Sequence, residues 1–316
     1  MSNLTEKKTI SIVIPVFNEE ENILNAYDRV LSVAEQYKDK YNTEILFTDN
    51  HSSDNTNDLL TEIAAKNNSV KVIRFSKNFG YQQSILTGYV YSSGDAVVQL
   101  DCDMQDPPEL ILDFINYWED GYEIVYGIRK SRKENFVINN IRKFFYKLIQ
   151  TLSNDNLPMN AGDFRLIDKK IVEILRNLDK NKIYLRGLIA SFGFKQKGIE
   201  YDREKRRKGL SNFKLADLFG LAFDGILNHS MLPLRLASIV GILISLITIF
   251  GSLAYLIIKV YYPNSWPPGF ATTTILILIS ISLNGLFLGI IGEYIGRIYN
   301  ILKKRPNVII EKKLNI

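Results

Sequence analysis

The chain of 316 residues contains few of the residues that build disulfides and metal clusters, with one cysteine and two histidines. The single Cys102 excludes an internal disulfide and is compatible with a reducing compartment. Residues 1–9 are polar and lack the apolar core of a signal peptide. We therefore expect the part of the chain before the first long apolar segment to stay in the cytoplasm.

Charge of neither sign dominates the composition. The net charge is +5 and the sequence pI about 9.0, a mild basic excess that suits an anionic substrate or a membrane surface. Zinc, helix-turn-helix and RNA-binding motifs are missing, which argues against nucleic acid as a partner. The length exceeds that of a usual single domain, so we expect a core domain with additional segments.

The first half of the chain alternates short β-rich runs with helical patterns. The predicted strands are Ile10–Pro15, Glu44–Thr48, Val70–Phe75, Ala96–Leu100 and Ile124–Gly127. The predicted helices between them are Glu20–Tyr37, Thr56–Lys66, Tyr81–Ser92 and Pro108–Asp120. This order predicts an α/β fold with a mostly parallel sheet and helices on both faces.

Two long apolar runs, Leu236–Ile258 and Phe270–Ile291, follow in the last third of the chain. Each is long enough to cross a hydrocarbon core of about 30 Å. The linker Val260–Gly269 is aromatic and proline-rich, and basic residues follow the second run. This pattern predicts a cytoplasmic domain (1–230), a transmembrane hairpin (231–295) and a basic cytoplasmic tail (296–316) in a multi-pass membrane protein. The alternative is a buried helical hairpin in a soluble protein.

Other segments could contact the membrane or a second subunit. Asn139–Leu152 is a basic amphipathic helix that lies in the membrane interface or packs on the sheet. Small residues in both apolar runs, among them Gly241 and Gly289, favour close helix packing, either within the chain or in a homo-oligomer. Val308–Ile310 is a candidate strand that could pair with a neighbouring subunit.

The stretch from Leu100 to Glu109 carries the strongest chemical signal. It closes a predicted buried strand, and Asp101, Asp103 and Gln105 project from one side of an extended chain. Open α/β sheets bind ligands at this end of their strands. Hard oxygen ligands at this spacing suit Mg²⁺ or Mn²⁺ held against a diphosphate. The alternative is a pair of turn or helix-capping aspartates.

Two further strand ends carry polar loops. Ile12–Glu20 is a strand that leads into a loop and an acidic helix start, and Phe47–Asp54 repeats this pattern one unit later. The first loop of such a sheet is a natural place for a nucleotide. Asp49 could accept hydrogen bonds from a base or a ribose. Taken singly, both loops could be ordinary helix starts.

The order of these motifs resembles family 2 glycosyltransferases of the A-type, Rossmann-like nucleotide-sugar fold. The resemblance is closer to the polyprenyl-phosphate glycosyltransferases, the group of the GtrB-like bactoprenol glucosyltransferases and dolichyl-phosphate mannosyltransferase. It covers nearly the whole chain, the two apolar runs included. It implies a hexosyltransferase of cell-envelope glycan synthesis that needs a divalent metal, with a nucleotide-sugar donor and a lipid acceptor.

The resemblance also implies roles for individual residues. The implied catalytic residues are Asp163, Asp103 and Arg129, and Asp163, in the motif Asn160–Leu166, is the family's candidate base. The implied metal ligands are Asp101, Asp103 and Gln105. The implied nucleotide-sugar contacts are Pro15, Asn18, Glu19, Asp49, Asp101 and Arg206, and the implied acceptor-phosphate contacts are Arg132 and Arg165. A salt bridge is the alternative role of Asp163.

The sequence departs from the family at one motif. The family commonly has two acidic residues followed by glycine, and this chain has Asp49-Asn50-His51 at that place. The expected reaction is inverting transfer of one glucose from UDP-glucose to undecaprenyl phosphate at the cytoplasmic membrane face. Transfer of mannose from GDP-mannose is an alternative. A processive polysaccharide synthase lacks support because no Gln-x-x-Arg-Trp motif is present. A non-catalytic membrane scaffold disagrees with the retained motif acids.

Overall fold

The computed structural model describes residues 7–130, 161–178, 185–203, 269–302, 306 and 308–316, with single positions between 239 and 261. The chain forms two compact units. The first comprises Met1–Tyr146, Asp155–Asn212 and Arg305–Ile316, and the second comprises Lys147–Asn154 and Phe213–Lys304. The sheet and the site described below belong to the first unit.

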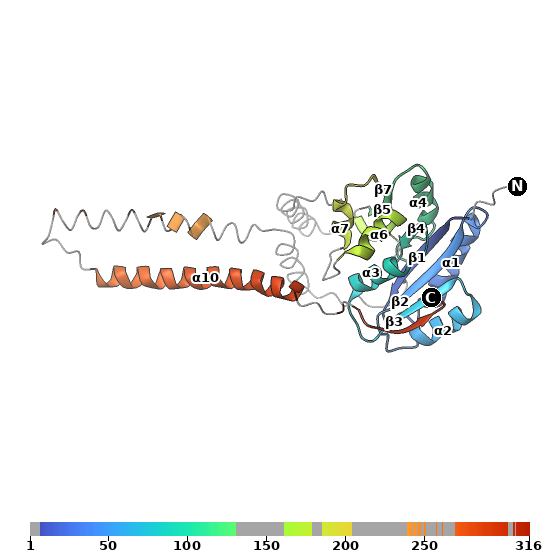
Figure 1. Ribbon diagram of the computed structural model, residues 1–316, viewed down its shortest axis with the longest axis horizontal. Helices are drawn as coiled ribbons and strands as arrows, with labels where there is room; N and C mark the ends of the chain where they lie inside the picture. Colours follow the sequence, from blue (N-terminus) through green and yellow to red (C-terminus); the bar gives the residue numbers. More distant parts are fainter. Residues whose placement is uncertain are drawn as a thin grey trace. The chain divides into compact units, whose positions relative to one another are not determined.

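An eight-stranded sheet in the order β7-β5-β6-β4-β1-β2-β3-β8 organises the first unit (Figure 1). Pairing is parallel within β2–β1–β4, β2–β3 and β5–β7, whereas β6 and β8 run antiparallel to their neighbours. The strands are β1 (Thr9–Val16), β2 (Asn42–Asp49), β3 (Val70–Phe75), β4 (Ala96–Gln99), β5 (Ile124–Arg129), β6 (Ala161–Asp168), β7 (Gln196–Tyr201) and β8 (Ile310–Leu314).

Helices cover both faces of this sheet because its inner strands are apolar on both sides. In β1, Ile12 and Ile14 pack in one buried cluster and Val13 packs in the other. The first cluster includes side chains of α1 (Ile23–Tyr37), α2 (Thr56–Lys66) and α4 (Leu110–Glu119). The second includes side chains of α3 (Tyr81–Tyr91), α6 (Lys169–Asn177) and α7 (Leu185–Ser191). The result is a three-layer α/β/α unit.

The predicted mostly parallel α/β fold is confirmed, and the predicted strands and helices coincide with β1–β5 and α1–α4 to within a few residues. The sequence analysis missed β6, β7, α6 and α7. The strand β7 reads Gln196-Lys-Gly-Ile-Glu-Tyr201, which lacks the apolar character of the inner strands because it lies at the edge of the sheet. The candidate interfacial helix Asn139–Leu152 lies outside the described residues.

The C-terminal strand corrects one expectation. Residues Ile310–Leu314 pair antiparallel with β3 of the same chain, not with a neighbouring subunit. Figure 1 shows β8, in red, beside β3. Without β8, the edge of β3 would present unpaired backbone groups. A segment of the same chain can pair with this edge without the loss of translational and rotational entropy that binding a second subunit requires.

The helix α10 (Phe270–Leu302) has 33 residues, which corresponds to about 50 Å at 1.5 Å per residue. Many of its described large apolar side chains, such as Leu276, Ile281 and Leu288, are exposed. Within the described residues, no helix combines the length and the apolar character required of a membrane-crossing segment. Most of Leu236–Ile258 lies outside the described residues. The two predicted membrane spans therefore stay a prediction.

The packing of α3 on β1 depends on Gly88. A β-carbon at this position would lie 2.1 Å from Cγ1 of Val13, so a larger residue has to displace buried strand β1. We expect Gly88→Ala to lower the free energy of unfolding by about 1–3 kcal/mol. Thermal unfolding of the purified chain measures this loss. Val13→Ala provides room for the new methyl group, so Gly88→Ala should cost less stability in a Val13→Ala background than in the unmodified chain. An equal cost in both backgrounds would contradict the proposed clash.

Candidate active site

The carboxyl ends of β1, β2 and β4 meet at one edge of the sheet, because the three strands are parallel neighbours. A cleft of about 410 Å³ opens there. It is lined by residues from the end of β1, from the loops after β1, β2, β3 and β4, and from the start of α3: Pro15, Val16, Phe17, Glu19, Asn50, Asn78, Gly80, Tyr81, Ser84, Asp101, Cys102 and Asp103. The predicted site residues Pro15, Glu19, Asp101 and Asp103 are therefore brought together.

The loops after β1 and β2 hold each other in place. The backbone N–H of Asn18 donates to Oγ of Ser52 at 2.9 Å, and Oδ1 of Asn18 accepts from the N–H of Ser53 at 2.8 Å. Glu19 N–H donates to Oγ1 of Thr56 at 2.9 Å. The backbone of Asn18 has a positive φ of 54°, a conformation that asparagine tolerates. The side chain of Asn18 thus joins the two loops and does not line the cleft.

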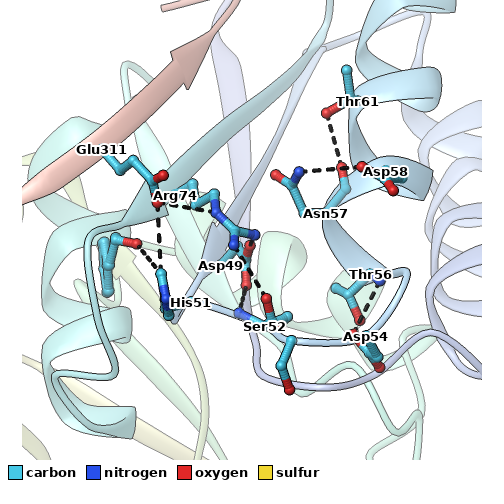
Figure 2. Close-up of polar contacts among 12 residues, drawn as sticks. Asp49, His51, Ser52, Asp54, Thr56, Asn57, Asp58, Thr61, Arg74 and Glu311 are labelled. Carbon is cyan, nitrogen blue, oxygen red and sulfur yellow. Dashed lines mark hydrogen bonds and ion pairs between the residues drawn. The ribbon is translucent and has the colours of Figure 1, made fainter.

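The carboxylate of Asp49 is fully buried beneath the second loop. Arg74 Nη1 donates to its Oδ2 at 2.7 Å, and the N–H of Ser52 donates to its Oδ1 at 2.8 Å (Figure 2). Arg74 also reaches Glu311 of β8, with Nε at 3.1 Å from Oε2. Asp49 does not line the cleft, so its contact with a base stays a prediction. Its observed role is to organise the loop that carries Asn50.

Asn50, which follows Asp49 directly, does line the cleft. Its Oδ1 accepts from the N–H of Phe79 at 2.8 Å, and its Nδ2 donates to Oδ1 of Asn78 at 2.9 Å. The amide therefore holds the loop between β3 and α3. The neighbouring His51 does not line the cleft, and its Nδ1 lies 3.0 Å from the carbonyl oxygen of Phe75. Figure 2 shows this side chain facing Glu311 of β8.

Two donors converge on one oxygen of Asp101. Tyr81 O–H donates to Oδ1 at 2.5 Å and Gln99 Nε2 donates to the same atom at 2.9 Å. Burial raises the pKa of Asp101 to about 6, although the hydrogen bond from Tyr81 acts to lower it, and the charge of Asp106 adds to the rise.

Cys102 lies between the two aspartates. Burial, followed by the charge of Glu19, raises the pKa of the Cys102 thiol, which agrees with a packing role.

Asp103 and Asp101 fit a divalent cation as a pair. Oδ1 of Asp103 accepts the N–H of Gln105 at 3.1 Å, and the turn between them places Met104 at φ 52°. In the described part of the chain, the hydrogen bonds to both carboxylates use Oδ1 and leave Oδ2 for a hard cation at the cleft. No cluster of three His, Cys, Asp or Glu side chains occurs among the described residues, so the remaining ligands would be substrate or water. Gln105 is buried and does not line the cleft.

Asp163, at the start of β6, pairs with an arginine that the sequence analysis did not identify. Arg186 of α7 donates from Nη2 to Oδ2 at 2.8 Å and from Nε to Oδ1 at 3.4 Å. Against the effect of burial, the charge of Arg186 lowers the pKa of Asp163. The carboxylate is therefore ionised at neutral pH. Arg165 is buried at 5% exposure and donates to the carbonyl oxygen of Gly162.

Arg129 lies at the end of β5, between the loop after β4 and the start of β6. Its Nη2 donates to Oδ2 of the buried Asp106 at 2.8 Å, and its Nε donates to the hydroxyl oxygen of Tyr201 at 3.2 Å. A β-carbon on Gly162 would come within 3.1 Å of Nη2, so the glycine lets β6 pass the guanidinium. Arg129 is close enough to Asp163 to contribute to its lowered pKa.

The structure thus groups the predicted carboxylates and Arg129 around one edge of the sheet. Arg132 and Arg206 lie outside the described residues. The roles of these and the other predicted site residues stay predictions. Sequence analysis missed Tyr81, Asp106, Arg186 and Tyr201; of these, only Asp106 carried a signal, since it follows the Asp-x-Asp-x-Gln pattern directly.

Comparison with known proteins agrees with this architecture. The family described as "Glycosyl transferase family 2" matches residues 11–175. The chain is 39% identical to the uncharacterized glycosyltransferase YkcC of Bacillus subtilis over 97% of this chain and 94% of YkcC. It is 33% identical to the SfII prophage-derived bactoprenol glucosyl transferase of Shigella flexneri, over 96% of this chain and 97% of that protein. The mannosyltransferase PcManGT of Pyrobaculum calidifontis, solved with GDP-Man and Mn²⁺, has a similar fold, with a TM-score of 0.50 at 12% identity over 95% of this chain and 89% of that chain.

The ion pair of Asp163 predicts a pH-dependent contribution to stability. A carboxylate whose pKa lies below its usual 3.8 stabilises the fold above that pH, and this stabilisation is lost as the pH falls through the lowered pKa. We expect Arg186→Gln to cost about 2 kcal/mol at pH 7, and less below pH 3, where Asp163 becomes protonated in the folded chain as well. Denaturant unfolding across this range measures the difference.

Arg176→Gln is the matched control. Arg176 donates to the main-chain carbonyl oxygens of Val90 and Ser92, so its loss should be independent of pH. A stability loss in Arg186→Gln that is equal below pH 3 and at pH 7 would contradict the role given to the pair.

Proposed function

Because the chain belongs to glycosyl transferase family 2, we propose that it transfers a single glucose from UDP-glucose to the phosphate of a polyprenyl lipid. The cleft that opens beside Asp101 and Asp103 is the observation that carries this proposal. Relatives named bactoprenol glucosyl transferase match over nearly the full length of both chains, and their names suggest the glucose and the lipid.

The described residues support direct displacement at the sugar. A phosphate oxygen of the acceptor forms the new bond to the anomeric carbon, the bond to the donor diphosphate breaks, and the configuration inverts. A divalent cation, Mg²⁺ or Mn²⁺, at Asp101 and Asp103 would neutralise charge on the departing diphosphate. Arg129 would add charge-assisted hydrogen bonds to phosphate oxygens. A phosphate monoester has a second pKa of about 6, so the acceptor is largely dianionic at neutral pH.

Asp163 has a restricted part in this chemistry. Its lowered pKa makes it a weak base at neutral pH. The dianionic acceptor phosphate needs little help to lose a proton. We infer that Asp163, held by Arg186 at 2.8 Å, orients groups beside the anomeric carbon and takes a residual proton at most.

The membrane placement completes the proposal. A polyprenyl tail remains in the bilayer, so the site has to lie close to the membrane surface. We propose that Leu236–Ile258 and Phe270–Ile291 cross the cytoplasmic membrane and that the catalytic unit faces the cytoplasm. Exposed apolar side chains on α10 support this, because apolar surface of this extent is rare in contact with water. Basic residues after α10 support a cytoplasmic C-terminus.

A donor panel tests the proposal. Purified protein in detergent, with Mn²⁺ or Mg²⁺ and undecaprenyl phosphate, is expected to form a lipid monohexoside from UDP-glucose, identified by mass spectrometry. GDP-mannose as the preferred donor would redirect the assignment to a mannosyltransferase. Products with several sugars would indicate a processive synthase, and absence of any glycolipid with every donor would overturn the proposed function.

The carboxylate pair gives a second prediction. Asp103→Asn removes a charged ligand at the cleft, so we expect the transfer rate to fall by about 100-fold or more and binding of Mn²⁺ with UDP to weaken. Titration calorimetry measures the binding. Asp113→Asn, at an exposed position on α4, is the control that should leave both unchanged. Near-normal transfer by Asp103→Asn would exclude this residue as a metal ligand.

A further inference from the structure

Asp106 follows the predicted metal ligands directly in the chain but is not among the residues that line the cleft. Its side chain is fully buried. The buried carboxylate contacts residues from two other strand ends. A buried charge of this kind is costly unless several partners compensate it. Its partners therefore indicate what the charge is used for.

Both oxygens of Asp106 are engaged. Oδ2 accepts from Nη2 of Arg129 at 2.8 Å, and Oδ1 accepts from the hydroxyl of Tyr201 at 2.5 Å. Arg203 forms an ion pair, with Nε at 3.3 Å from Oδ1. Tyr201 also accepts from Nε of Arg129 at 3.2 Å, which closes a ring of contacts between the loop after β4, the end of β5 and the end of β7.

The charges in this cluster do not balance. Two guanidinium groups face a single carboxylate, so the cluster itself retains positive charge. The carboxylate is inaccessible, whereas the side chains of Arg129 and Arg203 are 31% and 24% exposed. Nε of Arg203 has no hydrogen bond among the described residues, so charge alone holds this group to Asp106. The exposed parts of both arginines remain available to an anion.

We propose that Asp106 is a positioning residue that, with Tyr201, holds Arg129 and Arg203 side by side as a binding site for phosphate oxygens. The proposal rests on the proposed function for the identity of the phosphate, which is that of the lipid acceptor or that of the donor diphosphate. Arg129 contacts Asp106 in the loop after β4, which also carries Asp101 and Asp103, and it lies near Asp163. A phosphate bound to Arg129 would therefore lie close to this loop and to Asp163. The carboxylate itself would not touch the substrate.

A matched pair of tyrosines tests this proposal. Tyr201 is 5% exposed and donates to Asp106 at 2.5 Å, and Tyr41 is 6% exposed and donates to Glu119 at 2.5 Å, away from the cleft. Tyr201→Phe and Tyr41→Phe each remove one buried hydroxyl group that donates a hydrogen bond to a carboxylate. Asp106→Asn provides a stronger perturbation where the variant folds.

Two binding probes distinguish the phosphates: UDP with Mn²⁺, and a prenyl monophosphate in detergent micelles. We expect Tyr201→Phe to weaken one of them by about five- to ten-fold, and Tyr41→Phe to change neither by more than about two-fold. The affected probe identifies the phosphate. In the transfer assay, KM for that substrate should rise more than kcat falls.

Equal binding by Tyr201→Phe and the unmodified chain would overturn the positioning role. Equal losses in both tyrosine variants, in parallel with their melting temperatures, would also overturn it, because they would indicate a purely structural contact. Failure of the unmodified chain to transfer sugar would reject the proposed function. The binding comparison would still decide whether Asp106 and Tyr201 arrange an anion site.

Discussion

The parallel pairing of β1 with both β2 and β4 is the constraint on which the rest of the site depends. Because β1 lies between these two strands in the same direction, the loops that follow all three leave the sheet at one edge. From β1, the chain first adds β2 and β3 on one side of this strand and then places β4 on its other side. Open α/β sheets bind ligands at such points. The cleft is a consequence of this topology.

Charge pairing then gives the loops their shape. Three carboxylates that are not among the cleft-lining residues, Asp49, Asp106 and Asp163, each contact an arginine at 2.7–2.8 Å. Each of these pairs joins a residue at a strand end to a partner on another element. Asp101 and Asp103, two of the carboxylates that line the cleft, instead accept hydrogen bonds from neutral groups. This division leaves the negative charge of the cleft for a cation and places positive charge around it.

The C-terminal strand extends this organisation to the far end of the chain. Glu311 of β8 contacts Arg74, which in turn contacts Asp49 and the carbonyl oxygen of Ser52 (Figure 2). Residues on both sides of α10 in the sequence therefore contribute to one sheet.

Local sequence patterns determined the alternation of β1–β5 with α1–α4 and the strand-end position of Asp101 and Asp103. Buried strands and amphipathic helices leave a signature in neighbouring residues, so these elements could be predicted. The strands β6 and β7 left no such signature. Asp163 in β6 pairs with Arg186 of α7, which lies 23 positions further along the chain. The tertiary structure alone decided which groups pair, because Tyr201 lies 95 positions from Asp106 and Arg74 lies 237 from Glu311. Charge complementarity acts through space, and its partners cannot be read from neighbours in the chain.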